Sequence, residues 1–125
     1  MDTHVWLWCL ERPERLAETA RSAILGAEEV VLSVASVWEA GIKHGLGKLT
    51  LEDGVRPLLD AAVRGLRAKV LPITTEHVLE AAALPLYHRD PFDRVLIAQA
   101  RLESLILVSA DPWFRGYDVP MLWAA

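Results

Sequence analysis

The stretch DPFDRVLIAQARLESLILVSAD, residues 90–111, indicates the fold class because it joins a helix to a buried strand. Asp90 is a favourable N-cap and Pro91 suits the first helical position, so residues 90–103 are predicted to form a helix. Residues 105–111 are a continuous apolar run that ends in Asp111, which is typical of a strand covered on both faces. A helix followed directly by such a strand favours an α/β fold.

The same alternation extends upstream and downstream of this stretch. The predicted elements are a strand at 30–33, helices at 36–46 and 55–66, a strand at 69–73, a helix at 74–84 and a short last strand at 119–122. Short apolar strands that alternate with helices are typical of a parallel sheet covered on both faces. We therefore expect one domain over residues 1–125, a three-layer α/β/α sandwich with a mainly parallel central sheet.

Composition narrows the class of protein further. Hydrophobic residues make up 53% of the chain, which excludes disorder for most of its length. The net charge of −4 argues against a simple basic nucleic-acid binder, but not against an enzyme that reaches phosphates through bound cations. The single Cys9 rules out an internal disulfide and a zinc site built from cysteines. With no long apolar run and no signal-peptide pattern, we expect a cytoplasmic protein without membrane segments.

A set of acidic residues stands at places where strands end or helices begin. Its members are Asp2, Glu39, Asp90, Asp93 and Asp111. Asp111 directly follows one predicted strand, and Glu39 comes one helical turn after a second predicted strand. These two acids are therefore expected near one sheet edge, together with Asp2 if Asp2 also ends a strand. Clustered carboxylates repel one another, and lysines are scarce. A hard divalent cation, Mg²⁺ or Mn²⁺, matches such all-oxygen ligands.

Each of these acids also has a purely structural explanation. Ser36 and Glu39 have the spacing of a capping box, in which the serine caps a helix and the glutamate reaches back. Asp90 and Asp111 each precede a proline, as N-caps often do. Asp93 lies in the first turn of its helix, where the helix dipole favours a negative charge. Capping and catalysis therefore both remain possible explanations at this point.

Four motifs together carry a family resemblance. They are DTHVWLW (2–8), SVASVWEAGIKHGLGKL (33–49), LPLYHRDPFDRVLIAQA (84–100) and LVSAD (107–111). In this order and combination the chain resembles the PIN-domain family, and more narrowly the VapC-type toxins of bacterial toxin–antitoxin pairs. The resemblance covers nearly the whole chain. It implies a PIN-like fold and a metal-dependent endoribonuclease that hydrolyses RNA with metal-activated water.

The resemblance also implies roles for individual residues. Asp2, Asp93 and Asp111 correspond to the chief ligands of Mg²⁺ or Mn²⁺, and Glu39 completes the catalytic set directly or through water. Supporting roles fall to Ser109, which could position the water or a ligand, and to Asp90, which we take as a cap first and a ligand second. The implied partners are the RNA substrate, a cognate antitoxin protein and a second copy of the chain in a homodimer.

Basic residues near these acids are possible phosphate contacts. His88 and Arg89 precede the acidic helix, although they are equally well explained as a solvated loop. Lys43 stands four residues after Glu39, so it either pairs with that glutamate along the helix or contacts a substrate phosphate. Arg94 is expected to face water.

One departure from the family concerns the beginning of the chain. Members of the family carry several apolar residues before the DTH motif, and these form a central first strand, whereas here only Met1 precedes Asp2. We expect either that the true start lies upstream or that this strand is nearly absent, which would expose the edges of its neighbours.

Three other functions are compatible with parts of the sequence. A response-regulator receiver domain also clusters aspartates around Mg²⁺, but it needs an acidic pair after its first strand and a lysine after its last core strand. Asp2 stands alone and no lysine follows Lys69. The other two are a catalytically weak binding module and a nuclease that acts on DNA or structured RNA.

Overall fold

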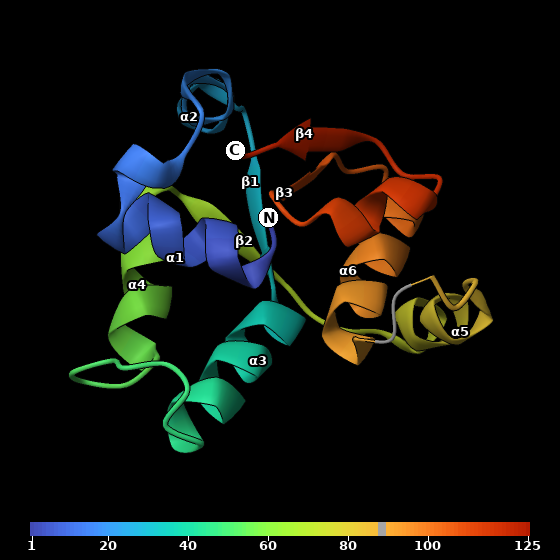
Figure 1. Ribbon diagram of the computed structural model, residues 1–125, viewed down its shortest axis with the longest axis horizontal. Coiled ribbons are helices and arrows are strands. Elements are labelled where there is room, and N and C mark those ends of the chain that lie inside the picture. Colours follow the sequence, from blue (N-terminus) through green and yellow to red (C-terminus); the bar gives the residue numbers. More distant parts are fainter. Residues whose placement is uncertain (88–89) are drawn as a thin grey trace.

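The computed structural model describes residues 1–87 and 90–125 (Figure 1). Its elements in chain order are α1 (Thr3–Glu11), the 3₁₀ helix η1 (Pro13–Arg15), α2 (Glu18–Gly26), β1 (Val30–Ser33), α3 (Val34–Gly45), α4 (Arg56–Gly65), β2 (Ala68–Leu71), α5 (Thr75–Ala83), α6 (Pro91–Leu102), β3 (Leu107–Ser109), η2 (Pro112–Gly116) and β4 (Met121–Trp123). All elements predicted above are present; β1 has the predicted bounds, and the ends of the others are shifted. Helices α1 and α2 and the two 3₁₀ helices were not predicted. In α2 only Ala20 and Ile24 are buried, so its apolar periodicity is weak.

The strands pair in parallel, as predicted, but they form two separate sheets rather than one. Strand β1 pairs with β2 in the register Val30 to Ala68. Strand β3 pairs with β4 in the register Leu107 to Met121. Each sheet has only two strands, so each needs helices on its faces to bury its apolar side chains.

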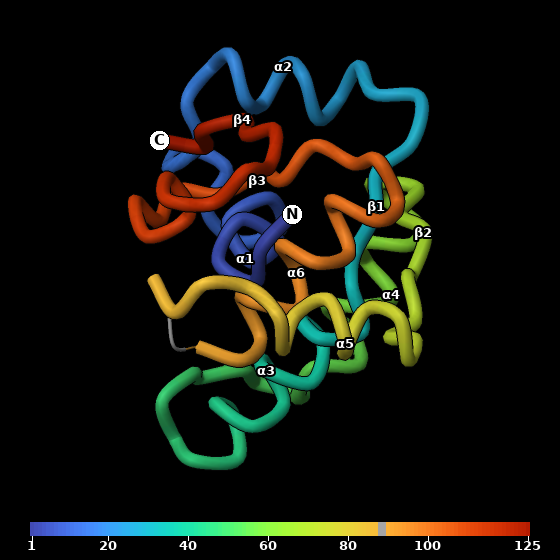
Figure 2. Tube along the Cα trace, turned by 90° about the vertical axis from the view of Figure 1, so that its right-hand side faces the viewer, coloured from blue at the N-terminus to red at the C-terminus, as the bar shows by residue number. Residues whose placement is uncertain are grey.

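The beginning of the chain lies between these two sheets. The amino group of Met1 donates to the carbonyl of Val31 in β1, at 3.2 Å. The next N–H, that of Asp2, donates to the carbonyl of Val108 in β3, at 2.9 Å. Successive N–H groups that point to opposite neighbours are the pattern of a strand inside a sheet. Met1 and Asp2 thus occupy the position of a central strand, and the N-terminus lies between β1 and β3 in both views (Figures 1 and 2).

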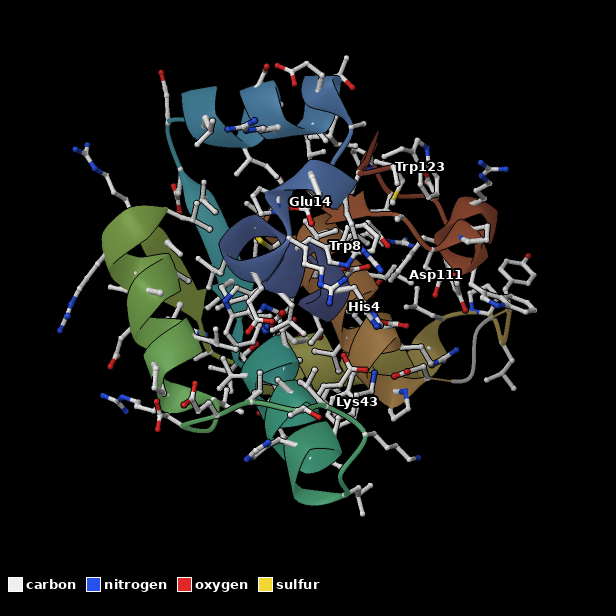
Figure 3. All side chains as sticks on the ribbon, turned by 60° about the vertical axis from the view of Figure 1, so that its left-hand side comes forward. His4, Trp8, Glu14, Lys43, Asp111 and Trp123 are labelled. Atoms are coloured by element: carbon white, nitrogen blue, oxygen red, sulfur yellow. The ribbon has the colours of Figure 1, made fainter. Side chains whose placement is uncertain are left out.

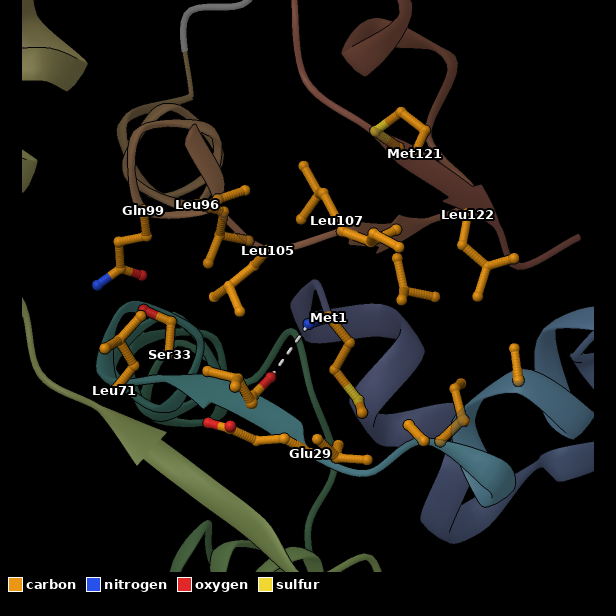
Figure 4. Close-up of a pocket in the computed structure, with 18 of the residues that line it drawn as sticks. Met1, Glu29, Ser33, Leu71, Leu96, Gln99, Leu105, Leu107, Met121 and Leu122 are labelled. Carbon is orange, nitrogen blue, oxygen red and sulfur yellow. Dashed lines mark hydrogen bonds between the residues drawn. The ribbon is translucent and has the colours of Figure 1, made fainter. Parts of the chain in front are cut away.

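A cleft lies where residues placed before Met1 would extend this central strand. It has a volume of about 470 Å³ and lies between the edges of β1 and β3 (Figure 4). Its walls are mostly apolar and include Val31, Leu96, Leu105 and Leu107. The facing edges of the two sheets are therefore joined only at Met1 and Asp2 within the described residues.

Apolar core residues lie on both sides of the strands. On one side Trp6 of α1 and Ala62 of α4 pack with Leu32 of β1. On the other side Ile97 of α6 packs with Phe114 of η2. Helices α1 and α4 accordingly cover one side and α5 and α6 the other (Figure 1). This arrangement confirms the three-layer α/β/α class.

Arg94 corrects one expectation, because it is buried rather than facing water. Only 8% of it is exposed. Its guanidinium donates to the carbonyls of Ala81, Leu84 and Pro85, at 2.8, 2.9 and 3.0 Å. These carbonyls lie at the end of α5, where a helix leaves carbonyls without partners inside the helix. Arg94 therefore ties α6 to the last turn of α5.

Candidate functional site

Asp2 is the best-defined acid of the predicted site. It caps α1, and its carboxylate accepts a hydrogen bond from the N–H of Val5 at 2.9 Å. The same carboxylate accepts a hydrogen bond from the hydroxyl of Ser109. The side chain is buried, and this burial raises the pKa of Asp2, while the hydrogen bonds from Ser109 and Val5 act in the opposite direction. Burial thus desolvates the carboxyl group of Asp2 and disfavours its negative charge.

Glu39 is the second buried acid, and the residue after Asp2 holds it in place. The hydroxyl of Thr3 donates to one carboxylate oxygen of Glu39. The ammonium of Lys43 lies 3.0 Å from the other oxygen. Because Thr3 directly follows Asp2, this bond brings the carboxylates of α1 and α3 to the same region. The explanation of Lys43 as the i,i+4 partner of Glu39 is confirmed, and the sequence reasoning missed the role of Thr3.

The predicted capping box at Ser36 and Glu39 is wrong. Helix α3 begins at Val34, immediately after β1, and its N-cap is Ser33, whose hydroxyl accepts from the N–H of Ala35 at 3.0 Å. Ser36 lies inside the helix, and its buried hydroxyl has no hydrogen-bond partner among the residues that the structure describes. Since strand and helix meet without a loop, Glu39 lies in the second turn of the helix and is free of a capping role.

Ser109 connects Asp2 to Asp111. The Ser109 oxygen accepts a hydrogen bond from the N–H of Asp111 at 3.0 Å while its hydroxyl donates to Asp2. The carboxylate of Asp111 accepts from the N–H of Trp113 at 3.0 Å, so this acid caps η2, as the Asp–Pro pair predicted. Ser109 itself is fully buried. One hydroxyl thereby fixes the positions of two candidate ligands.

The acids of α6 lie at its first turn. Asp90 is the N-cap, and its carboxylate accepts from the N–H groups of Phe92 and Asp93 at 2.9 and 3.3 Å. The capping role given first to Asp90 is therefore confirmed. Asp93 is half-buried, and its helix packs against α3, which carries Glu39. His88 and Arg89 lie outside the described residues.

Hydrogen bonds therefore join Glu39 to Thr3 and join Asp2 and Asp111 to Ser109, and the peptide bond between Asp2 and Thr3 connects the two groups. No group of three or more His, Cys, Asp and Glu side chains within residues 1–87 and 90–125 is close enough to hold a metal ion. The donors are nevertheless all carboxylate or hydroxyl oxygens, which suits Mg²⁺ and Mn²⁺. Asp2 is desolvated, and a cation would offset that cost. The chemistry of the donor set thus fits a hard cation, and ligation by Asp2, Glu39, Asp93 and Asp111 stays a prediction.

The face around these acids carries further polar and aromatic side chains. Figure 3 shows His4, Lys43 and Asp111 on one face, with Trp8 and Trp123 on the side of His4 and Asp111 that is away from Lys43. His4 is exposed on the first turn of α1.

Among the described residues, no helix is long and apolar enough to cross a membrane.

Comparison with known proteins gives consistent results. A profile of the PIN domain family matches residues 1–120. The chain is 29% identical over 121 residues to Ribonuclease VapC22 of Mycobacterium tuberculosis, an alignment that covers 96% of this chain and 92% of that protein. It also superposes, with a TM-score of 0.74 and 12% identity, on a chain of the crystal structure of VapBC2 from Rickettsia felis bound to a DNA fragment from their promoter. That match covers 98% of this chain and 96% of the other.

Proposed function

The chain belongs to the PIN domain family, and from this premise we propose that it is a VapC-type toxin, an endoribonuclease that hydrolyses RNA phosphodiesters. The observation that carries the proposal is the pair of buried carboxylates, Asp2 and Glu39, linked through Thr3 and joined by Ser109 to Asp111. The pKa of Asp2 is raised by burial, and a buried acid with a raised pKa is typical of a functional site. The similarity to a protein named as a ribonuclease supports the same activity. Membership of the family contradicts the receiver-domain alternative.

We assign the binding of Mg²⁺ or Mn²⁺ to Asp2, Asp93 and Asp111, with Glu39 completing the set. When bound, such ions would supply a deprotonated water and stabilise the charge of the leaving oxygen. The protein's own side chains would then hold these carboxylates in fixed positions. Ser109 does so for Asp2, and Thr3 does so for Glu39.

Lys43 has a second role in this proposal. In the structure it neutralises Glu39, with 36% of its side chain exposed. A cation bound at Glu39 would compete with that ammonium and leave it available for a substrate phosphate. His88 and Arg89, next to α6 in the sequence, are proposed as further phosphate contacts, because arginine makes forked contacts with phosphate oxygens.

We infer that a cognate antitoxin protein is the partner of this chain in the cell. The support is the structural similarity to a chain of a complex titled VapBC2. A homodimer and a cytoplasmic location complete the proposal, since its substrate would be cellular RNA.

The decisive test is an RNA cleavage assay on the purified protein with Mn²⁺, and separately with EDTA. We expect cleavage only with the metal, giving 5′-phosphate and 3′-hydroxyl ends. Asp93→Asn and Asp111→Asn should each lower the rate by about a hundredfold or more, because each removes a charge that stabilises the transition state. Asp60→Asn is the matched control, since Asp60 pairs with Arg56 on the surface of α4.

Two results would overturn the proposal. Activity that persists in EDTA would exclude the metal mechanism, and full activity of both Asn variants would exclude the assigned site. Parallel substrates of single-stranded DNA and structured RNA separate a nuclease with another target from the proposed one. Binding of RNA without cleavage under all conditions would instead identify a binding module.

A further inference from the structure

Trp123 lies beside the acidic site because of its position in β4. It is the ladder partner of Ser109 in the parallel pair of β3 and β4. Register partners in adjacent strands project their side chains to the same face of a sheet. The side chain of Ser109 points to Asp2, so the indole of Trp123 lies on the face that carries Asp2. This indole is half-buried.

An arginine stacks on this indole from solvent. The guanidinium carbon of Arg115, in η2, lies 5.0 Å from the centroid of the Trp123 ring. Arg115 itself is exposed. Asp111 is the N-cap of η2, so the stack is connected to the candidate site through Asp111 as well as through Ser109, the ladder partner of Trp123.

A second stack of the same kind stands on α1. Trp8 follows His4 by four residues, and residues at this spacing share a helix face. The guanidinium carbon of Arg15 lies 5.8 Å from the centroid of the Trp8 ring. Trp8 is half-buried and Arg15 is exposed. Figure 3 shows Trp8 and Trp123 on one side of His4 and Asp111, away from Lys43.

These two stacks share a chemistry that suits a nucleic acid. The cation–π contact holds each guanidinium over the face of its indole, and both arginines are exposed to solvent. A guanidinium held in this way can stack on a nucleobase, and its edge can donate to a phosphate. Only an unpaired base offers a free face for such stacking, because the bases of a duplex already stack on one another.

We propose that the pairs Arg15–Trp8 and Arg115–Trp123 bind unpaired nucleotides of the substrate on the side of the acidic site away from Lys43. This inference rests on the proposed ribonuclease function and deepens it, since it names side chains outside the acidic site that bind the substrate. The two guanidiniums are binding and positioning groups, and the carboxylates remain the catalytic ones.

The test measures binding separately from cleavage. The affinity of a fluorescent single-stranded RNA of about ten nucleotides is measured by anisotropy in EDTA for the wild type, Arg15→Gln and Arg115→Gln. We expect binding to weaken about tenfold for each substitution, as for the loss of one base stack. Arg64→Gln on α4, an exposed arginine outside both stacks, is the matched control and should bind like the wild type.

Lysine variants separate stacking from simple charge. Arg15→Lys and Arg115→Lys keep the positive charge but lose the planar group, so the inference predicts nearly the same loss of affinity as for glutamine. The loss should disappear for an RNA with abasic sites in place of the stacked bases. A duplex of the same sequence should bind equally to the wild type and all four variants.

The results that would overturn the inference are specific to it. Wild-type affinity in the glutamine variants would exclude the stacks as binding sites. Wild-type affinity in the lysine variants would show that only the positive charge contributes to binding, and not the planar guanidinium. In cleavage assays the inference predicts a raised KM with an unchanged kcat for the arginine variants. Failure of the wild type to cleave any RNA would overturn the proposed function, whereas unchanged KM values in an active enzyme would overturn only this inference.

Discussion

The hydroxyl of Ser109 donates a hydrogen bond to the carboxylate of Asp2, although 107 positions separate the two residues in the sequence. Ser109 ends β3 and Asp2 begins the chain's first helix as its N-cap. Both side chains are buried. The bond therefore fixes the first helix to the C-terminal sheet at the centre of the candidate site.

Ser109→Ala should destabilise the protein by about 1–3 kcal/mol, because it leaves the buried Asp2 carboxylate and the Asp111 N–H without this partner. Urea unfolding measures the difference. Ser22→Ala, at an exposed position of α2, is the control and should change stability by less than about 0.5 kcal/mol. Equal stability of the Ser109 variant and the wild type would show that this bond is not needed.

The buried carboxyl of Asp2 predicts a pH-dependent effect in metal-free protein. Since burial raises its folded-state pKa above the usual 3.8, the protonated form stabilises the fold, and this contribution is lost as the pH rises through the raised pKa. Asp2→Asn should therefore become more stable relative to the wild type as the pH rises from about 3 to 6.

Urea midpoints in EDTA at several pH values measure this difference for Asp2→Asn, and Asp60→Asn serves as the exposed counterpart. Asparagine is also a good N-cap, so the start of α1 is retained. A stability difference that stays constant with pH, or that shrinks as the pH rises, would contradict the explanation by burial.

Arg94 is predicted to be essential for stability rather than for catalysis. Arg94→Met should cost about 3 kcal/mol, since it removes the donors that satisfy the carbonyls of Ala81, Leu84 and Pro85. Arg101→Met on the same helix is the matched control, because Arg101 only pairs with Glu80 near the surface, and it should cost below about 1 kcal/mol. Similar costs for the two variants, read from urea unfolding, would refute the role of Arg94.

The cleft beyond Met1 predicts that an added strand would stabilise the protein. A segment of about five β-branched apolar residues placed before Met1 should pair with β1 and β3 and raise stability by roughly 1–3 kcal/mol. The control is a glycine–serine segment of equal length. Either segment converts the buried amino group of Met1 to an amide, so a difference between the two segments reports on the added strand. Thermal unfolding and Mn²⁺ affinity are measured, and equal values for both segments would defeat the prediction.

Much of the fold could be predicted from local patterns in the sequence. Strand β1 has the predicted bounds, Val30–Ser33, and α6 begins after the predicted cap Asp90 with Pro91 at its first position. Such signals act between residues a few positions apart, so they can be recognised in the sequence without the tertiary structure. The same locality explains the error at Ser36, since a capping spacing cannot reveal that β1 runs directly into the helix and that Ser33 takes the cap.

The acids of the site were recognisable in the sequence, but their partners were not. Placement after predicted strands indicated Glu39 and Asp111 as candidates, and the family resemblance indicated Asp2. Contacts such as Thr3 to Glu39, Ser109 to Asp2 and Arg115 to Trp123 join residues whose spacing follows no local rule. Only the packing of helices against two parallel sheets brings them together, since contact across the core depends on the path of the whole chain.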